Sequence, residues 1–129
     1  MLHQRHYTAE QANALLPDVR MTVRRLQRAR RLLQDEDFDA GFATHADVVG
    51  GAFPGHIRAK AAVAATLGFE HLEDLDLLVR DLEAGLIDFP AVRDGREVYL
   101  SWQIDEREVG HWHAAETGHP SRLPLDPLS

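Results

Sequence analysis

The sequence predicts an α+β fold in which two long antiparallel helices pack on a three- to four-stranded antiparallel β-meander. Two patterns support this fold class. Apolar residues recur every three or four positions in two separate segments, which is typical of amphipathic helices. From Glu97 to Ile104, polar and apolar residues alternate, which is typical of a strand with one buried face. The chain of 129 residues is long enough for a single domain with its own core.

The first helix is predicted over residues 8–34. Thr8 and Gln11 match a capping box, in which each side chain bonds the backbone N–H of the other residue. Pro17 removes one helical hydrogen bond, so we expect either a kink there or a break between two helices. The arginines from Arg20 to Arg31 form either a solvated face or a patch for an acidic partner. The second interpretation favours a contact within the chain or within a homodimer.

Residues 35–55 combine acidic residues with glycines, and we expect a mobile loop there because loops of this length are rarely part of a compact core. The helical pattern resumes over residues 56–76, where alanines and leucines share one face. Gly68 marks either a soft point in one long helix or the junction of two. The apolar run Leu77–Val79 predicts a short fourth strand.

The meander is predicted over residues 86–113, followed by an irregular tail over residues 114–129. Asp94-Gly95 predicts a two-residue hairpin turn, because both residues tolerate the positive φ that this turn needs. Pro90 lacks a backbone N–H, so its strand should lie at an edge or carry a bulge. The apolar residues of the central strand should face the helices; they are Val98, Leu100, Trp102 and Ile104.

Composition excludes several classes of function. The formal net charge of −7 repels phosphate backbones, so nucleic acid is not an expected partner. The absence of cysteine excludes disulfides and thiolate catalysis, and it fits a reducing cytoplasm. No apolar run approaches the roughly 18–20 residues that a membrane span needs, and no secretory signal is recognisable. We therefore expect a cytoplasmic protein that does not bind membranes.

Two histidines suggest a metal site. Strand alternation places His111 and His113 on one face, where two imidazoles can share a divalent ion such as zinc or manganese. The carboxylates available to complete the site are Glu97, Glu106 and Glu116. Asp88 is expected to lie about 10 Å from His113, two strand spacings away, and therefore outside the site. The alternative is that His113 bonds an acid inside the fold while His111 lies on the surface.

Asp88 is the most unusual polar residue, because it stands between Ile87 and Phe89. A carboxylate in an apolar run is costly unless it is paired or solvated. It either pairs with an arginine, for which Arg93, Arg96 and Arg122 are candidates, or lines a ligand pocket. The pocket residues would then be Asp88, Arg96, Arg122 and Trp102.

The segment GLIDFPAVRDGREVYLSW, followed by Glu106, Trp112-His113, Gly118, Arg122, Pro124 and Leu125, together with the early TAEQANALLP, resembles the bacterial domain-of-unknown-function family 2203. Ser101 stands where a cysteine is common in that family, and Asp105 where a glycine is common. An aromatic residue is usual at the position of His111. The family has no established activity, so the resemblance implies the fold and the location of a site.

Two functions are consistent with these observations. The first is a small non-enzymatic binding or self-associating module, with a homodimer formed through the helices. The second is a divalent-metal-binding protein or metal-assisted hydrolase that uses His111 and His113.

Overall fold

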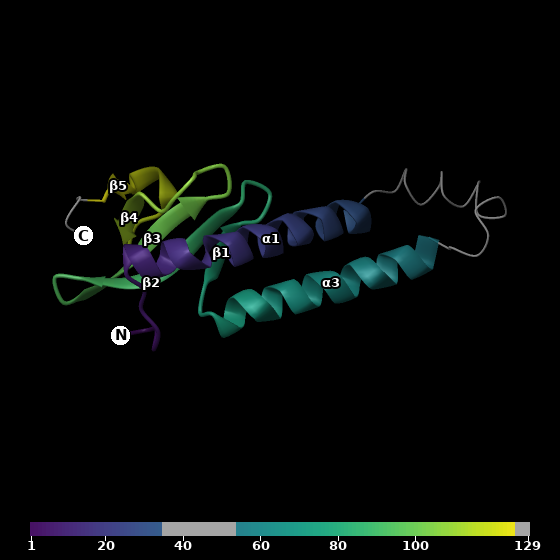
Figure 1. The fold of residues 1–129 in the computed structure, drawn as a ribbon, viewed down its shortest axis with the longest axis horizontal. Helices are drawn as coiled ribbons and strands as arrows, with labels where there is room; N and C mark the ends of the chain where they lie inside the picture. The colour runs from purple at the N-terminus through teal and green to yellow at the C-terminus, as the bar shows by residue number, and fades with distance from the viewer. Residues whose placement is uncertain (35–53, 126–129) are drawn as a thin grey trace.

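The computed structural model describes residues 1–34 and 54–125 (Figure 1). Its elements in chain order are α1 (Ala9–Gln34), α3 (Pro54–Asp74), β1 (Leu78–Asp81), β2 (Leu86–Arg93), β3 (Arg96–Gln103), β4 (His111–Ala114), the 3₁₀ turn η1 (His119–Ser121) and β5 (Leu123–Pro124). The predicted α+β class is confirmed. The sheet has five strands, not three or four, because β5 forms within the tail that was predicted to be irregular. Of the loop predicted over residues 35–55, residues 35–53 lie outside the described residues.

The sheet is an antiparallel meander in the order β1-β2-β3-β4-β5. The predicted hairpin turn between β2 and β3 is confirmed, since Asp94 and Gly95 have φ values of 52° and 76°. The Pro90 carbonyl accepts a hydrogen bond from the backbone N–H of Tyr7, on the side away from β3. The nitrogen of Pro90, which carries no hydrogen, faces that same side. Pro90 lies beyond the last residue of β2 that pairs with β1, so the sheet loses no ladder bond there.

The core lies between α1 and one face of the sheet. The register of β2 and β3 aligns their buried apolar residues in pairs, which are Ile87–Trp102, Phe89–Leu100 and Ala91–Val98. The apolar seam of α1 packs on this face through Ala12, Leu16, Val19, Val23 and Leu26. The predicted orientation of the central strand is confirmed, with Ile104 partly buried against the same cluster. From α3, Leu72 joins this core.

The first helix runs unbroken through Pro17, so the predicted alternative of two shorter helices is wrong. The predicted capping box is present, because the Thr8 N–H donates to Gln11 Oε1 and the Gln11 N–H donates to Thr8 Oγ1. Residues of α1 before and after Pro17, such as Leu16 and Val19, are buried in the same core. Their burial offsets the proline penalty of about 3 kcal/mol.

The second helix lies along α1 and runs in the opposite direction (Figure 1). Arg58 near its start donates a hydrogen bond to the Leu33 carbonyl near the end of α1, and His71 near its end binds Asp18. We call residues 18–34 of α1 together with α3 the two-helix arm. Its tip, at residues 28–34 and 54–60, extends past the sheet, and its base lies at Asp18 and residues 70–74.

Gly68 lies in the middle of an unbroken α3, so the predicted alternative of two helices is wrong here too. A Cβ at Gly68 would lie 2.7 Å from Leu26 Cδ2, and Leu26 is fully buried. Gly68→Ala should therefore destabilise the fold by about 1–3 kcal/mol, because overpacking outweighs the helix propensity of alanine. Gly55, also in α3, has no atom within 4 Å of its Cβ position, so Gly55→Ala should not destabilise. Urea unfolding of both variants tests this; stabilisation by Gly68→Ala would contradict it.

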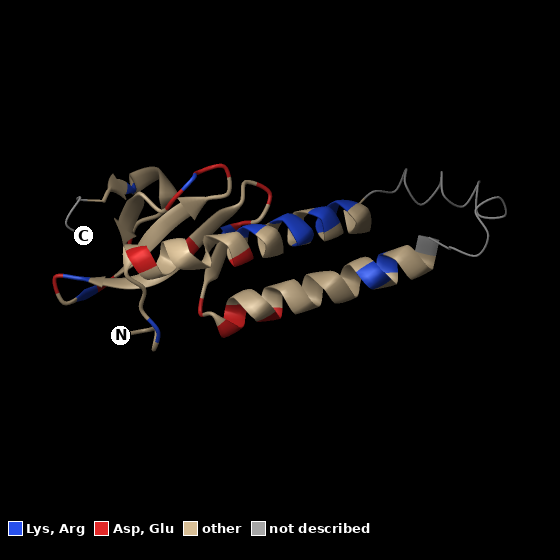
Figure 2. Cartoon of the chain, viewed as in Figure 1, with Lys and Arg blue, Asp and Glu red and all other residues tan. Residues whose placement is uncertain are grey.

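Within the described ranges, neither helix combines the length and the apolar character that crossing a bilayer requires. Charges are unevenly distributed over the arm (Figure 2). Basic residues run along α1 from Arg20 to Arg31 and lie near the tip in α3, and acidic residues lie at the base.

Candidate functional site

A layer of buried polar side chains lies on the face of the sheet opposite α1. Strand alternation turns Asp88 away from its apolar neighbours in β2, and the register aligns it with Ser101 of β3. In the same way, Tyr99 of β3 aligns with His113 of β4. All four side chains are buried, and we call them the polar layer.

Asp88 and His113 bond directly, with 2.8 Å between Oδ2 and Nε2. The expected separation of about 10 Å is wrong for the side chains, although the backbones lie on strands separated by β3. Both side chains reach across β3, at a position where that strand carries the small Ser101. The predicted arginine partner of Asp88 is present, but it is Arg80 of β1. Arg80 Nε donates a hydrogen bond to Asp88 Oδ2, with 2.8 Å between the two atoms. The Arg80 guanidinium also lies over the Tyr99 ring, 4.9 Å from its centroid.

The hydrogen-bond partners of His113 define what it can do chemically. Its Nδ1 lies 2.8 Å from the Ala114 carbonyl oxygen, which only accepts, so Nδ1 carries a hydrogen. A hydrogen also lies between Nε2 and the Asp88 carboxyl group, because two lone pairs would repel each other at that distance. Neither ring nitrogen presents a free lone pair, so His113 is not available as a metal ligand in this arrangement.

The segment before α1 is attached to the same face by Glu97. Its carboxylate accepts hydrogen bonds from the backbone N–H groups of Leu2 and His3 and from His6 Nε2, all within 3.0 Å. His3 also lies 2.8 Å from the Tyr99 hydroxyl and 3.2 Å from Asp76. Burial raises the pKa of Glu97, but the bonds from His6, His3 and Leu2 outweigh burial and lower the pKa to about 2.

This attachment should depend on pH. The pKa of Glu97 lies below its ordinary value of 4.5, so its contribution to stability is present above pH 4.5 and is lost as the pH falls toward about 2. Glu97→Gln should therefore be less stable than the natural protein at pH 7, and the difference should shrink between pH 4.5 and 2. Urea midpoints measured across this range test the prediction, with the exposed Glu116→Gln as control. A difference that stayed constant down to pH 2 would contradict it.

A second polar cluster surrounds the turn after β3. The Glu106 carboxylate accepts hydrogen bonds from Arg122 Nη1 and from the backbone N–H of Gln103, and each donor–acceptor distance is 2.8 Å. Burial raises the pKa of Glu106, but Arg122 and the Gln103 N–H outweigh burial, and the net direction is downward. The Glu106 carbonyl accepts bonds from Trp102 Nε1 and from Arg20 of α1. Glu106 thus joins α1, β3 and the C-terminal segment.

The predicted metal ligands are divided among separate places. His113 binds Asp88, Glu97 binds the N-terminal segment, and His111 Nδ1 lies 3.6 Å from Glu106. Glu116 is exposed in a turn. Over residues 1–34 and 54–125, no three His, Asp or Glu side chains form a group that could hold a metal ion.

The predicted ligand-pocket residues are also separated. Arg96 is exposed at the β2–β3 hairpin, Arg122 binds Glu106, and Trp102 lies in the apolar core on the other face from Asp88. Side chains that were not predicted from the sequence contact the polar layer or the Glu97 carboxylate beside it, above all Arg80, His3 and His6. Arg80 could have been considered as a partner of Asp88, because it follows the predicted short strand at Leu77–Val79. Nothing in the sequence indicated where His3 and His6 would bind.

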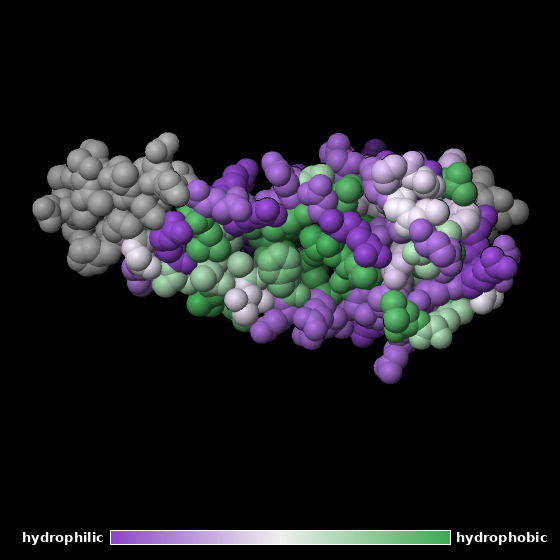
Figure 3. Space-filling view, turned by 180° about the vertical axis from the view of Figure 1, so that it is seen from behind, coloured by the Kyte–Doolittle hydropathy of each residue, from purple (hydrophilic) through white to green (hydrophobic). Residues whose placement is uncertain are grey.

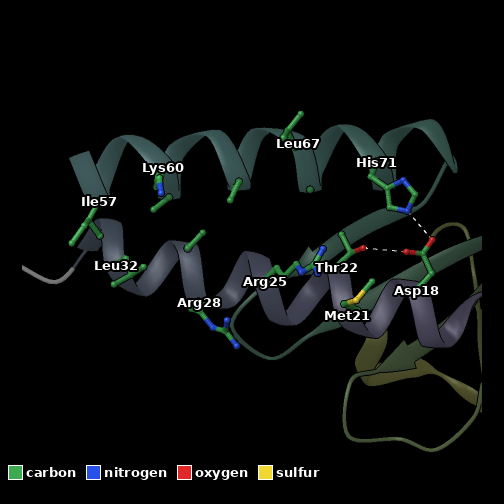
Figure 4. A pocket seen from close by; sticks show the side chains of 14 residues that line it. Asp18, Met21, Thr22, Arg25, Arg28, Leu32, Ile57, Lys60, Leu67 and His71 are labelled. Atoms are coloured by element: carbon green, nitrogen blue, oxygen red, sulfur yellow. Dashed lines mark hydrogen bonds and ion pairs between the residues drawn. The ribbon is translucent and has the colours of Figure 1, made fainter. Parts of the chain in front are cut away.

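A groove with a volume of about 650 Å³ lies elsewhere, between α1 and α3 (Figure 4). Apolar side chains line it along its length, with Arg25 among them; they are Met21, Ala29, Leu32, Ile57, Ala61, Ala64 and Leu67. At the base of the arm, Asp18 and His71 close the groove with a contact of 2.7 Å. Toward the tip, Arg28 and Lys60 line it. Figure 3 shows, from behind, further apolar surface in a hollow bordered by hydrophilic residues.

A comparison with known protein families gives a match over most of the chain. The sequence profile of the family described as "Uncharacterized conserved protein (DUF2203)" matches residues 5–125, which include every described helix and strand. The chain belongs to this family. No curated protein and no solved structure matches the chain. The description of DUF2203 gives no activity, so the function of this DUF2203 protein has to be argued from its own chemistry.

Proposed function

We propose that the chain is a non-enzymatic module that associates with a second copy of itself through the groove of the two-helix arm. The observation that carries this proposal is the exposure of α3. Among its described side chains, just Ala61 and Leu72 are buried, although the helix is rich in alanine and carries Val63, Leu67 and Phe69. Leu67 lines the groove and is 61% exposed.

An exposed apolar helix of this kind favours association. Burying a side chain such as leucine stabilises a protein by about 1.5–3 kcal/mol, and exposed apolar patches commonly mark contact surfaces. The groove is bordered by the small residues Ala61, Ala64 and Gly68, so a facing helix can approach closely. These features fit a protein partner better than a small polar ligand.

A second copy fits the groove because the groove carries both signs of charge. Asp18 lies at one end, Arg25 lies in the middle, and Arg28 and Lys60 lie toward the other end. A partner of a single charge would complement one end and be repelled by the other. A copy of the same chain can complement both ends, since in a two-fold dimer each contact occurs twice.

Two exposed alanines of α3 provide a matched test. Ala64 lines the groove and Ala62 does not, and both are exposed in the same helix. Ala64→Asp places a carboxylate in the proposed interface, where an unpaired polar group costs about 1–3 kcal/mol, so self-association should weaken on the order of tenfold to a hundredfold. Ala62→Asp has the same charge and a similar effect on helix propensity, and it should leave association unchanged. Sedimentation velocity over a concentration series measures both.

Two outcomes would contradict the proposal. One is a natural protein that stays monomeric at every concentration. The other is equal behaviour of the two variants, which would place the interface away from the groove. Circular dichroism and thermal unfolding at one fixed protein concentration show whether both variants remain folded, since the apparent stability of a dimer depends on concentration.

A further inference from the structure

A second concavity, formed by α1 alone, lies beside the groove and is lined mainly by arginines. Its volume is about 480 Å³, and its lining residues are Pro17, Arg20, Met21, Arg24, Arg25 and Arg28. Figure 2 shows the row of basic residues along α1 to which these arginines belong. Arg25 and Arg28 also line the groove, whereas Arg20 and Arg24 do not. We call this concavity with its four guanidinium groups the arginine site.

Arg20 is held in position by contacts inside the chain. Its Nη2 donates a hydrogen bond to the Glu106 carbonyl oxygen, with 3.0 Å between the two atoms. Its guanidinium group lies over the Trp102 ring, 5.3 Å from the centroid, and Trp102 is fully buried. The core therefore fixes the place of Arg20. Neither contact neutralises its charge, because a carbonyl oxygen and an aromatic ring carry no net charge.

The other three arginines of the site carry charge that nothing in the described chain compensates. Arg24, Arg25 and Arg28 are exposed, and no ion pair or side-chain hydrogen bond joins them to another described residue. Arg20, Arg24 and Arg28 follow one another at intervals of four residues, so they lie along one side of the helix. Like charges at this spacing repel each other and destabilise a helix. A bound anion would remove this repulsion.

We infer that the arginine site binds a compact polyanion whose anionic groups are phosphates or carboxylates. A guanidinium group donates paired hydrogen bonds to either kind of group. Four guanidinium groups around one concavity suit a ligand that carries at least two anionic groups. The nearest carboxylate along α1 does not compete for the site, because Asp18 is bound by His71 at the base of the groove, with 2.7 Å between the two atoms (Figure 4).

The ligand is compact because the basic surface is short and the rest of the chain is acidic. Arg20 and Arg28 are separated by about 12 Å along the helix axis, at 1.5 Å per residue. At physiological ionic strength, charges are screened beyond about 8 Å, so a small anion interacts mainly with the arginines beside it. A long polyanion such as a nucleic acid would extend past the site and meet the acidic surface that gives the chain its net charge of −7.

Arg24 allows this site to be tested separately from self-association, because Arg24 does not line the groove. In R24E a donor is lost and a repulsive charge is added, so the affinity for inorganic pyrophosphate should fall on the order of tenfold at low salt, and less at high salt. The matched control is R30E. Arg30 is exposed in the same helix and does not line the arginine site, so R30E should bind pyrophosphate like the natural protein.

Isothermal titration calorimetry measures the affinities of the three proteins, and circular dichroism shows that both variants are folded. A parallel series with citrate distinguishes the two kinds of anionic group, since the tighter of the two probes identifies phosphate or carboxylate as the group preferred. No binding of either probe to the natural protein, or equal losses in R24E and R30E, would overturn the arginine site. Pyrophosphate binding to a strictly monomeric natural protein would support this site while contradicting the proposed self-association.

Discussion

Asp88→Ala should lower the free energy of unfolding by about 3–5 kcal/mol, because it removes one partner from a buried charged cluster. The Asp88 carboxylate binds both Arg80 and His113, and the side chain of His113 is 2% exposed. Without the carboxyl group, His113 Nε2 loses its hydrogen-bond partner and has little access to water. Urea unfolding at one fixed protein concentration measures the loss.

The matched control is Asp105→Ala, at an exposed turn position between β3 and β4. It should change stability by less than about 0.5 kcal/mol. Similar values for the two substitutions would mean that the bond between Asp88 and His113 is not formed in solution. A further variant, Arg80→Ala, should cost less than Asp88→Ala, because the Arg80 side chain is 44% exposed and water replaces part of its interaction.

Trp102→Ala should also cost about 3–5 kcal/mol, through loss of packing. Trp102 is fully buried between α1 and the sheet, and its Nε1 donates to the Glu106 carbonyl over 3.0 Å. Truncation opens a cavity at the centre of the core and also removes a bond that holds the turn after β3. Trp102→Phe keeps most of the ring, so it should cost clearly less than the alanine variant. Unfolding midpoints in urea distinguish the two; equal, small losses would show that Trp102 is not part of the core.

The fold was predictable where a local pattern determines it. The capping box at Thr8, the alternation around Trp102 and the turn at Asp94-Gly95 each specify their own conformation within a few residues, and each is confirmed. At Pro17 a kink or a break was expected, and the break is wrong because burial of residues on both sides of the proline outweighs a local preference. The two-residue strand β5 was not predictable, because so short a strand has no periodicity to detect.

The surroundings of Asp88 show where local patterns stop being informative. The sequence indicated that Asp88 needs a partner, since a carboxylate between Ile87 and Phe89 cannot remain unpaired when it is buried. It did not identify His113, because backbone spacing alone does not show whether two side chains on the same face meet over an intervening strand. Contacts of the N-terminal segment with Glu97 depend on how the chain enters the fold, which no pattern in MLHQRHY specifies.

The central claim is that the apolar groove of the two-helix arm is covered by a second copy of the chain. Sedimentation equilibrium of the natural protein tests it most directly, from about 1 µM to about 1 mM, which spans association free energies of roughly −8 to −4 kcal/mol. The expected result is an average mass that rises from the monomer value of 14.5 kDa toward twice that value. A mass that stays at 14.5 kDa over the whole range would contradict the claim.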